Sequence, residues 1–93
     1  MAKQVNASHI LVESEKEATK IVERLNGGER FEDLAKKYSK CPSGKKGGAL
    51  GWFGRNQMVA EFEHAAFKSE PGNVVGPVRT NFGWHLILVN DVK

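Results

Sequence analysis

The side chains best suited to chemistry in this 93-residue chain are those of three histidines and a single cysteine. His9 and His85 lie in segments of alternating side chains that predict strands, each flanked by apolar residues, whereas His64 lies on a predicted helix and is expected to face solvent. Imidazole groups titrate near neutral pH, and two histidines in strand segments flanked by apolar residues favour a functional role more than one would. One histidine on a strand is more often a satisfied core residue, and these three lack zinc-site spacing, so we predict no metal.

Apolar side chains in the second half of the chain could form a small binding cup. Met58 and Phe62 are four residues apart in a segment, 57–68, whose periodicity predicts a helix, so they share one face. Such a pair is ordinarily part of a core. Leu50 lies in a short predicted strand, 49–53, that follows a glycine-rich stretch.

The elements that must position these residues alternate between strand and helix patterns. A capping box, Ser14-x-x-Glu17, opens a helix that ends at 26–28 (Asn-Gly-Gly), and a second helix begins near Arg30. Residues 41–48, with one proline and three glycines, are predicted to be a long loop that forms a flexible wall of the site. The predicted strands cover 4–12, 49–53, 74–80 and 84–89, and Gly76-Pro77 places the third of these at a sheet edge. This order predicts an α+β domain over residues 1–93 with a mostly antiparallel sheet.

Composition narrows the classes of partner. The net charge is +3, no apolar run reaches the roughly 20 residues that span a bilayer, and a lone cysteine forms no internal disulfide. Lysines cluster at 36, 37, 40, 45 and 46, which indicates a solvated basic face. Nucleic-acid binding is the weaker reading, because interleaved aromatics and a recognition motif are lacking. Without an apolar signal stretch we expect a cytoplasmic monomer, although a domain taken from a longer secreted or anchored protein would look the same.

Over nearly its whole length the sequence resembles the parvulin family of peptidyl-prolyl cis/trans isomerases. The matching pieces occur in order with matching spacing: SHILV at 8–12, FxxLAxxYS at 31–39, GGxLGxF at 47–53, QM at 57–58 with FE at 62–63, AF at 66–67, GPV at 76–78 and TxFGWHLI at 80–87. The likeness is greatest to short, stand-alone, non-phospho-specific parvulins. It implies a four-stranded antiparallel sheet surrounded by helices, with the active site on its concave side.

The resemblance also implies roles for individual residues. His9 and His85 would face each other, Thr80 would join their hydrogen-bonded cluster, and Cys41 would lie beside the isomerising bond. The substrate would be held by a proline pocket and its rim, formed by Leu50, Met58, Phe62 and Phe82. Phe82 stands where some relatives carry serine, so a mechanism that needs a hydroxyl there is in doubt.

Prolyl isomerisation breaks no bond, so the resemblance implies no cofactor, and 44–48 lacks the register of a phosphate-binding loop. The expected partners are proline-containing peptides and unfolded proteins. The histidines would act through structure and electrostatics. A covalent role for Cys41 is less favoured, because the reaction needs no covalent intermediate. The alternative function is a peptide-binding or chaperone module on the same fold without catalysis.

Overall fold

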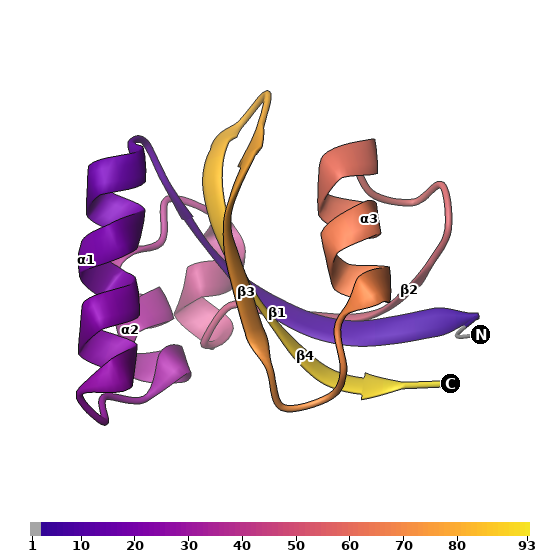
Figure 1. The fold of residues 1–93 in the computed structure, drawn as a ribbon, viewed down its shortest axis with the longest axis horizontal. Helices are drawn as coiled ribbons and strands as arrows, with labels where there is room; N and C mark the ends of the chain where they lie inside the picture. Colours follow the sequence, from indigo (N-terminus) through magenta and orange to yellow (C-terminus); the bar gives the residue numbers. More distant parts are fainter. Residues whose placement is uncertain (1–2) are drawn as a thin grey trace.

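The strand and helix patterns of the sequence produce four strands and three α-helices in the computed structural model, which describes residues 3–93 (Figure 1). In chain order the elements are β1 (Gln4–Val12), α1 (Glu15–Asn26), α2 (Phe31–Tyr38), the 3-10 helix η1 (Pro42–Lys46), β2 (Ala49–Gly54), α3 (Ala60–Lys68), β3 (Val74–Thr80) and β4 (Gly83–Val92). All strand pairs are antiparallel, which confirms the predicted α+β class and four-stranded sheet. None of the helices in the described part of the chain is long and apolar enough to cross a membrane.

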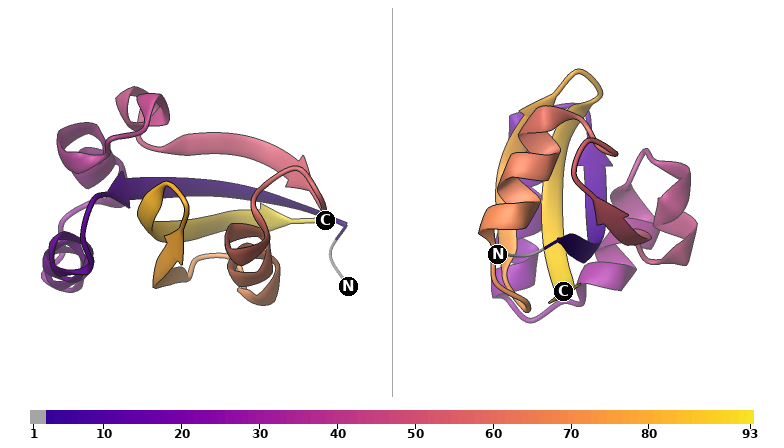
Figure 2. Two further views of the ribbon diagram at one scale, coloured as in Figure 1. Left: turned by 90° about the horizontal axis from the view of Figure 1, so that it is seen from above. Right: turned by 90° about the vertical axis from the view of Figure 1, so that its right-hand side faces the viewer.

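The sheet has the strand order β2-β1-β4-β3 and separates two apolar clusters. Figure 1 shows α1 and α2 on one side of the strands and α3 on the other, and Figure 2 shows the strands side by side. Alternation along β4 sends Leu86 into the cluster beneath α1 and α2, and Ile87 into the cluster beneath α3. Ile10 and Ala7 divide β1 in the same way. Both central strands are thereby covered on both faces.

The first helix begins where its capping sequence predicted. Ser14 is the N-cap, and its hydroxyl oxygen accepts a hydrogen bond from the Glu17 N–H at 3.2 Å. After Asn26 the chain turns back, with Gly28 in the left-handed region at φ 102°. These ends place α1 and α2 on the same side of the sheet, where residues of both helices join one apolar cluster (Figure 1).

Residues 41–48 differ from the predicted flexible loop, because they contain the compact helix η1. Pro42 has the fixed φ that suits the first position of a helix, and the Gly44 N–H donates to the Cys41 carbonyl at 2.9 Å. Gly44 is buried, and a Cβ built on it would lie 2.8 Å from the Ala35 carbonyl oxygen. The same proline and glycines that suggested irregular structure therefore allow close packing on α2. The prediction of an irregular loop was therefore wrong for residues 42–46, which form a 3-10 helix.

The third helix begins later than predicted. Its first residue is Ala60 rather than Gln57, because the Gln57 side-chain oxygen accepts a hydrogen bond from the Gly54 N–H at 2.8 Å and holds a turn. Val59 is extended at ψ 148°, and its carbonyl accepts the first helical bond from Glu63. Met58 therefore lies in the turn before α3, and its spacing from Phe62 does not arise from one continuous helix.

The last two predicted strands form an antiparallel hairpin. β3 is an edge strand, as Gly76-Pro77 indicated, and its register with β4 shifts between Val75 and Val78. β4 runs to Val92 and so exceeds the predicted end at Val89. The extra length arises because β4 pairs with the start of β1, where Val5 lies opposite Val92.

Candidate active site

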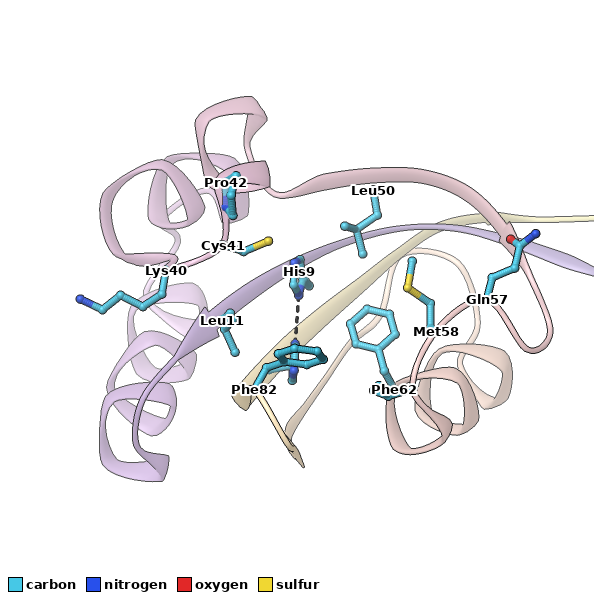
Figure 3. Close-up of a pocket in the computed structure, with 12 residues that line it drawn as sticks. His9, Leu11, Lys40, Cys41, Pro42, Leu50, Gln57, Met58, Phe62 and Phe82 are labelled. Carbon is cyan, nitrogen blue, oxygen red and sulfur yellow. Dashed lines mark hydrogen bonds between the residues drawn. The ribbon is translucent and has the colours of Figure 1, made fainter.

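A cavity of about 510 Å³ lies between β1, β2, the start of α3 and residues 40–42. The side chains around it are mostly apolar and converge from segments far apart in the sequence (Figure 3). The lining residues are His9, Leu11, Lys40, Cys41, Pro42, Leu50, Gln57, Met58, Val59, Phe62, Phe82 and His85. Its size falls within the range of about 300–1,000 Å³ that is common for ligand sites.

Sheet register brings the two histidines together. Leu11 lies opposite His85 and Ile87 opposite His9, so the histidines are diagonal neighbours on the same face of adjacent strands. Their Nδ1 atoms are 3.0 Å apart, and the rings stack with centroids 5.2 Å apart (Figure 3). Both residues are buried, with exposed fractions of 6% and 4%.

Thr80 lies behind this pair and extends its hydrogen bonds. Its Oγ1 is 2.7 Å from His85 Nε2 and accepts a bond from the Phe82 N–H at 3.1 Å. The hydroxyl hydrogen is used when it donates to His85 Nε2, and His85 Nδ1–H then donates to His9 Nδ1. This tautomer makes His9 Nε2 a donor. Among the described residues it is a buried atom without a partner.

Both imidazoles are held in their neutral form. Burial, together with a smaller effect of the neighbouring His85, lowers the pKa of His9 from 6.5 to about 4. Burial also lowers the pKa of His85. One Nδ1 must carry a hydrogen and the other must not, so the 3.0 Å contact itself requires the accepting ring to be neutral.

The apolar part of the cavity is a cup formed by Leu50, Met58 and Phe62 (Figure 3). Phe62 is 3% exposed and supports the cup from α3. Its ring stands edge-on to both histidines, with centroids 5.5 Å from His9 and 5.3 Å from His85. The cup and the histidine pair therefore share one wall.

Cys41 lies on the polar side of the cavity, at the start of η1. Its Sγ accepts a hydrogen bond from the Ser43 hydroxyl at 3.3 Å. Ser39 Oγ accepts from the N–H groups of both Leu11 and Cys41, at 3.1 and 3.3 Å. This shared acceptor fixes the thiol-bearing segment to β1, the strand that carries His9.

The structure brings together every residue predicted from the sequence. Seven of the eight line the cavity, namely His9, Cys41, Leu50, Met58, Phe62, Phe82 and His85, and Thr80 contacts it through His85. The side chain of Phe82, with 69% of its surface exposed, forms part of the rim. His64 is exposed and takes no part, as predicted.

Sequence analysis missed five lining residues, which are Leu11, Lys40, Pro42, Gln57 and Val59. Strand alternation could have indicated Leu11, which is two residues after His9 and on the same face. The other four adjoin predicted site residues in the chain, since Lys40 and Pro42 flank Cys41 and Gln57 and Val59 flank Met58. Among residues 3–93, no three or more His, Cys, Asp or Glu side chains form a cluster that could hold a metal ion.

The sequence and the fold match one known family. Residues 4–91 match the family model described as the PPIC-type PPIase domain, also called rotamase, and the chain belongs to this family. The family is that of the parvulins, as the sequence resemblance indicated.

Relatives share the fold at high similarity. The chain is 51% identical over 89 residues to foldase protein PrsA of Geobacillus kaustophilus, covering 95% of this chain and 32% of the relative. The crystal structure of peptidylprolyl isomerase PrsA from Bacillus cereus superposes with a TM-score of 0.95 at 49% identity, covering 99% of this chain and 36% of that one. The parvulin NmPin of Nitrosopumilus maritimus superposes with a TM-score of 0.87 at 42% identity, covering 98% and 99%. The chain thus spans about a third of the length of the PrsA relatives and nearly all of NmPin.

Proposed function

We propose that this chain catalyses the cis/trans isomerisation of X-Pro bonds in flexible or unfolded polypeptides and so assists folding. The observation that carries the proposal is the contact between an apolar cup and a neutral histidine pair. Phe62 joins the two, since its ring belongs to the cup and contacts both His9 and His85. Membership of the PPIC-type PPIase family supports the same activity.

The cup suits the proline ring. Rotation about the X-Pro bond must cross a barrier of about 18–20 kcal/mol, because the planar amide loses its resonance on the way. Leu50, Met58 and Phe62 can hold the ring by burying its methylenes while the preceding residue rotates. Removal of water also weakens the hydrogen bonds that stabilise the charge-separated planar amide.

The polar side of the cavity is positioned for the rotating carbonyl group. His9 and Cys41 lie beyond the cup, and their hydrogen bonds to His85 and Ser43 fix their orientation. We assign the histidines and Thr80 a positioning and electrostatic role, since both imidazoles are neutral and the reaction transfers no proton. Cys41 then adjusts the local field beside the carbonyl group without forming a covalent bond.

The decisive test measures isomerisation directly. Two-dimensional exchange NMR on a short Ala-Pro peptide should show cis/trans exchange accelerated by catalytic amounts of the chain, and a metal chelator should leave that acceleration unchanged. Binding of the same peptide without faster exchange would support the alternative of a non-catalytic chaperone module. Loss of the activity with a chelator would contradict the proposed mechanism.

We also propose a monomer that works in the cytoplasm on unfolded proteins. A partly exposed free thiol at Cys41 supports a reducing compartment. The large apolar side chains that are exposed lie on different elements, since Trp52 is on β2, Val74 on β3 and Phe82 on the cavity rim. Light scattering and cell fractionation test these two points.

A further inference from the structure

One wall of the cavity comes from a stretch of chain without acidic residues. Between Asp33 and Glu61 the sequence contains no aspartate or glutamate. The same stretch has six basic residues, Lys36, Lys37, Lys40, Lys45, Lys46 and Arg55. The cavity is lined by parts of this stretch, namely residues 40–42, 50 and 57–59. The electrostatic potential along this wall is therefore positive.

Lys40 is the charged residue among those that line the cavity. Its backbone is fixed, because its N–H donates to the Leu11 carbonyl at 2.7 Å and the next residue, Cys41, is bonded to Ser39. Its side chain is exposed and extends outward from the rim, so that the ammonium group points away from the cavity while the Cys41 sulfur points into it (Figure 3). The ion pairs of the described residues lie elsewhere, at Arg24–Glu29, Arg30–Glu32 and Arg55–Glu63, so the Lys40 ammonium group can pair with a ligand.

The rim around Lys40 continues in apolar side chains. The Leu11 carbonyl accepts the hydrogen bond from Lys40, and Leu11 lies opposite His85 in the sheet. Leu11 therefore lies between these two residues. Leu11 Cδ1 also lies 3.3 Å from the Cβ position of Gly83, the residue after Phe82. Lys40, Leu11 and Phe82 thus form a continuous rim on the histidine side of the cavity.

A bound proline would direct its preceding residue toward this rim. The ring occupies the cup of Leu50, Met58 and Phe62, and the imide carbonyl belongs to the residue before proline. His9 and Cys41 lie across the cavity from the cup. The residue before proline therefore places both its carbonyl group and its side chain near His9 and Cys41. Lys40 is the neighbour of Cys41 in the chain.

We propose that Lys40, with Leu11 and Phe82, forms a subsite for the side chain before proline and gives the chain a preference for glutamate there. This inference rests on the proposed isomerase activity. The two methylenes of glutamate can pack on Leu11 and Phe82, while its carboxylate pairs with the Lys40 ammonium group. Glutamine has the same shape without the charge and lacks that pair. Glu13 follows β1 two residues after Leu11 and opposes the effect, so its neutralisation should strengthen the preference.

The experiment compares kcat/KM for Glu-Pro, Gln-Pro, Lys-Pro and Ala-Pro peptides by exchange NMR. At roughly 10 mM salt the wild-type chain should favour Glu-Pro over Gln-Pro about three- to fivefold, as expected for an exposed ion pair. At about 0.5 M salt, where screening acts within a few ångströms, the ratio should fall below about twofold. Lys40→Gln should bring the ratio to about one at low salt, Lys40→Glu should favour Lys-Pro, and Glu13→Gln should raise the Glu-Pro ratio.

The matched control is Lys20→Gln, which removes one positive charge from the exposed surface of α1 and should keep the wild-type ratio. Equal rates for Glu-Pro and Gln-Pro, or a preference that survives Lys40→Gln, would overturn the inference while the Ala-Pro rate still supports the isomerase. Absence of turnover on every peptide, Ala-Pro included, would instead overturn the proposed function. Peptides with glutamate or glutamine after proline should react equally, and a preference at that position alone would show that the direction of the bound chain is reversed.

Discussion

His9 and His85 touch through their Nδ1 atoms, 3.0 Å apart, although neither lies directly opposite the other in the β1–β4 register. Their diagonal arrangement leaves His85 Nε2 free to contact Thr80, so one chain of hydrogen bonds runs from the hairpin turn to the cavity. A residue removed anywhere along this chain leaves a buried partner unsatisfied.

The first prediction concerns the loss of one histidine. His85→Ala should lower the free energy of unfolding by about 1–3 kcal/mol, because His9 and Thr80 each lose a buried hydrogen bond. Activity should fall as well. Urea unfolding and the Ala-Pro assay measure the two effects. His64→Ala, which alters an exposed histidine on α3, should change neither, and an unaltered melt for His85→Ala would refute the account.

The second prediction follows from the lowered pKa values of the pair. Unfolded histidine titrates near pH 6.5, whereas the pKa of folded His9 is about 4, so the unfolded chain binds more protons between these values. The free energy of unfolding should therefore be greatest above pH 6.5 and fall as the pH drops toward 4. His9→Gln should flatten this dependence. His64→Gln should keep the wild-type slope, and equal slopes for all three chains would contradict the prediction.

The third prediction is that the apolar cup contributes more to kcat/KM than the Cys41 thiol. Met58→Ala or Phe62→Ala should reduce kcat/KM roughly tenfold or more, because a buried apolar side chain contributes about 1.5–3 kcal/mol. Cys41→Ala should cost less than about tenfold. Val74→Ala truncates an exposed apolar side chain on β3 and serves as the control. If Cys41→Ala and Cys41→Ser prove the most damaging changes, covalent catalysis becomes the better account.

The fourth prediction tests the packing of η1 against β1. Gly48 has φ 86°, and a Cβ on it would overlap the His9 carbonyl oxygen and lie 3.2 Å from Ala35 Cβ. Gly51 has a similar φ of 76° with open space around its Cβ position. Gly48→Ala should therefore destabilise the fold by about 1–3 kcal/mol more than Gly51→Ala, the excess being the overpacking cost. Equal thermal melts would show that η1 can move away from His9.

The fifth prediction concerns phosphorylated substrates. The segment after β1, residues 13–17, carries three glutamates and one lysine and should repel a phosphate with about −1.5 to −2 charges. Phosphoserine before proline should therefore give no advantage beyond about tenfold over glutamate at physiological salt. Matched phosphoSer-Pro and Glu-Pro peptides provide the comparison. A larger advantage would mean that the lysines near the cavity bind phosphate in spite of these glutamates.

Much of this protein was predictable from local patterns. Period-two alternation placed His85 and Ile87 on the same strand face as Val89, and Ser14 marked the start of α1. The proline after Gly76 identified an edge strand, since it cannot donate to a neighbouring strand. Motif order supplied the family and, by resemblance, the eight site residues.

Local patterns misjudged the two segments that border the cavity. Helix α3 begins later than predicted because the Gln57 side chain accepts a hydrogen bond from the Gly54 backbone. Residues 42–46 form η1 rather than a loop because Gly44 packs closely on α2. Both depend on where a polar atom or a missing Cβ meets a partner, which composition does not specify.

The sequence by itself determined which faces of the strands are buried, because side-chain alternation repeats every two residues. Only the tertiary structure decided that His9 and His85 meet diagonally and that Lys40 lies at the cavity rim. Pairing register and the path of residues 39–48 set these positions. They depend on contacts between segments more than 25 residues apart, such as Ser39 with Leu11, which no local pattern contains.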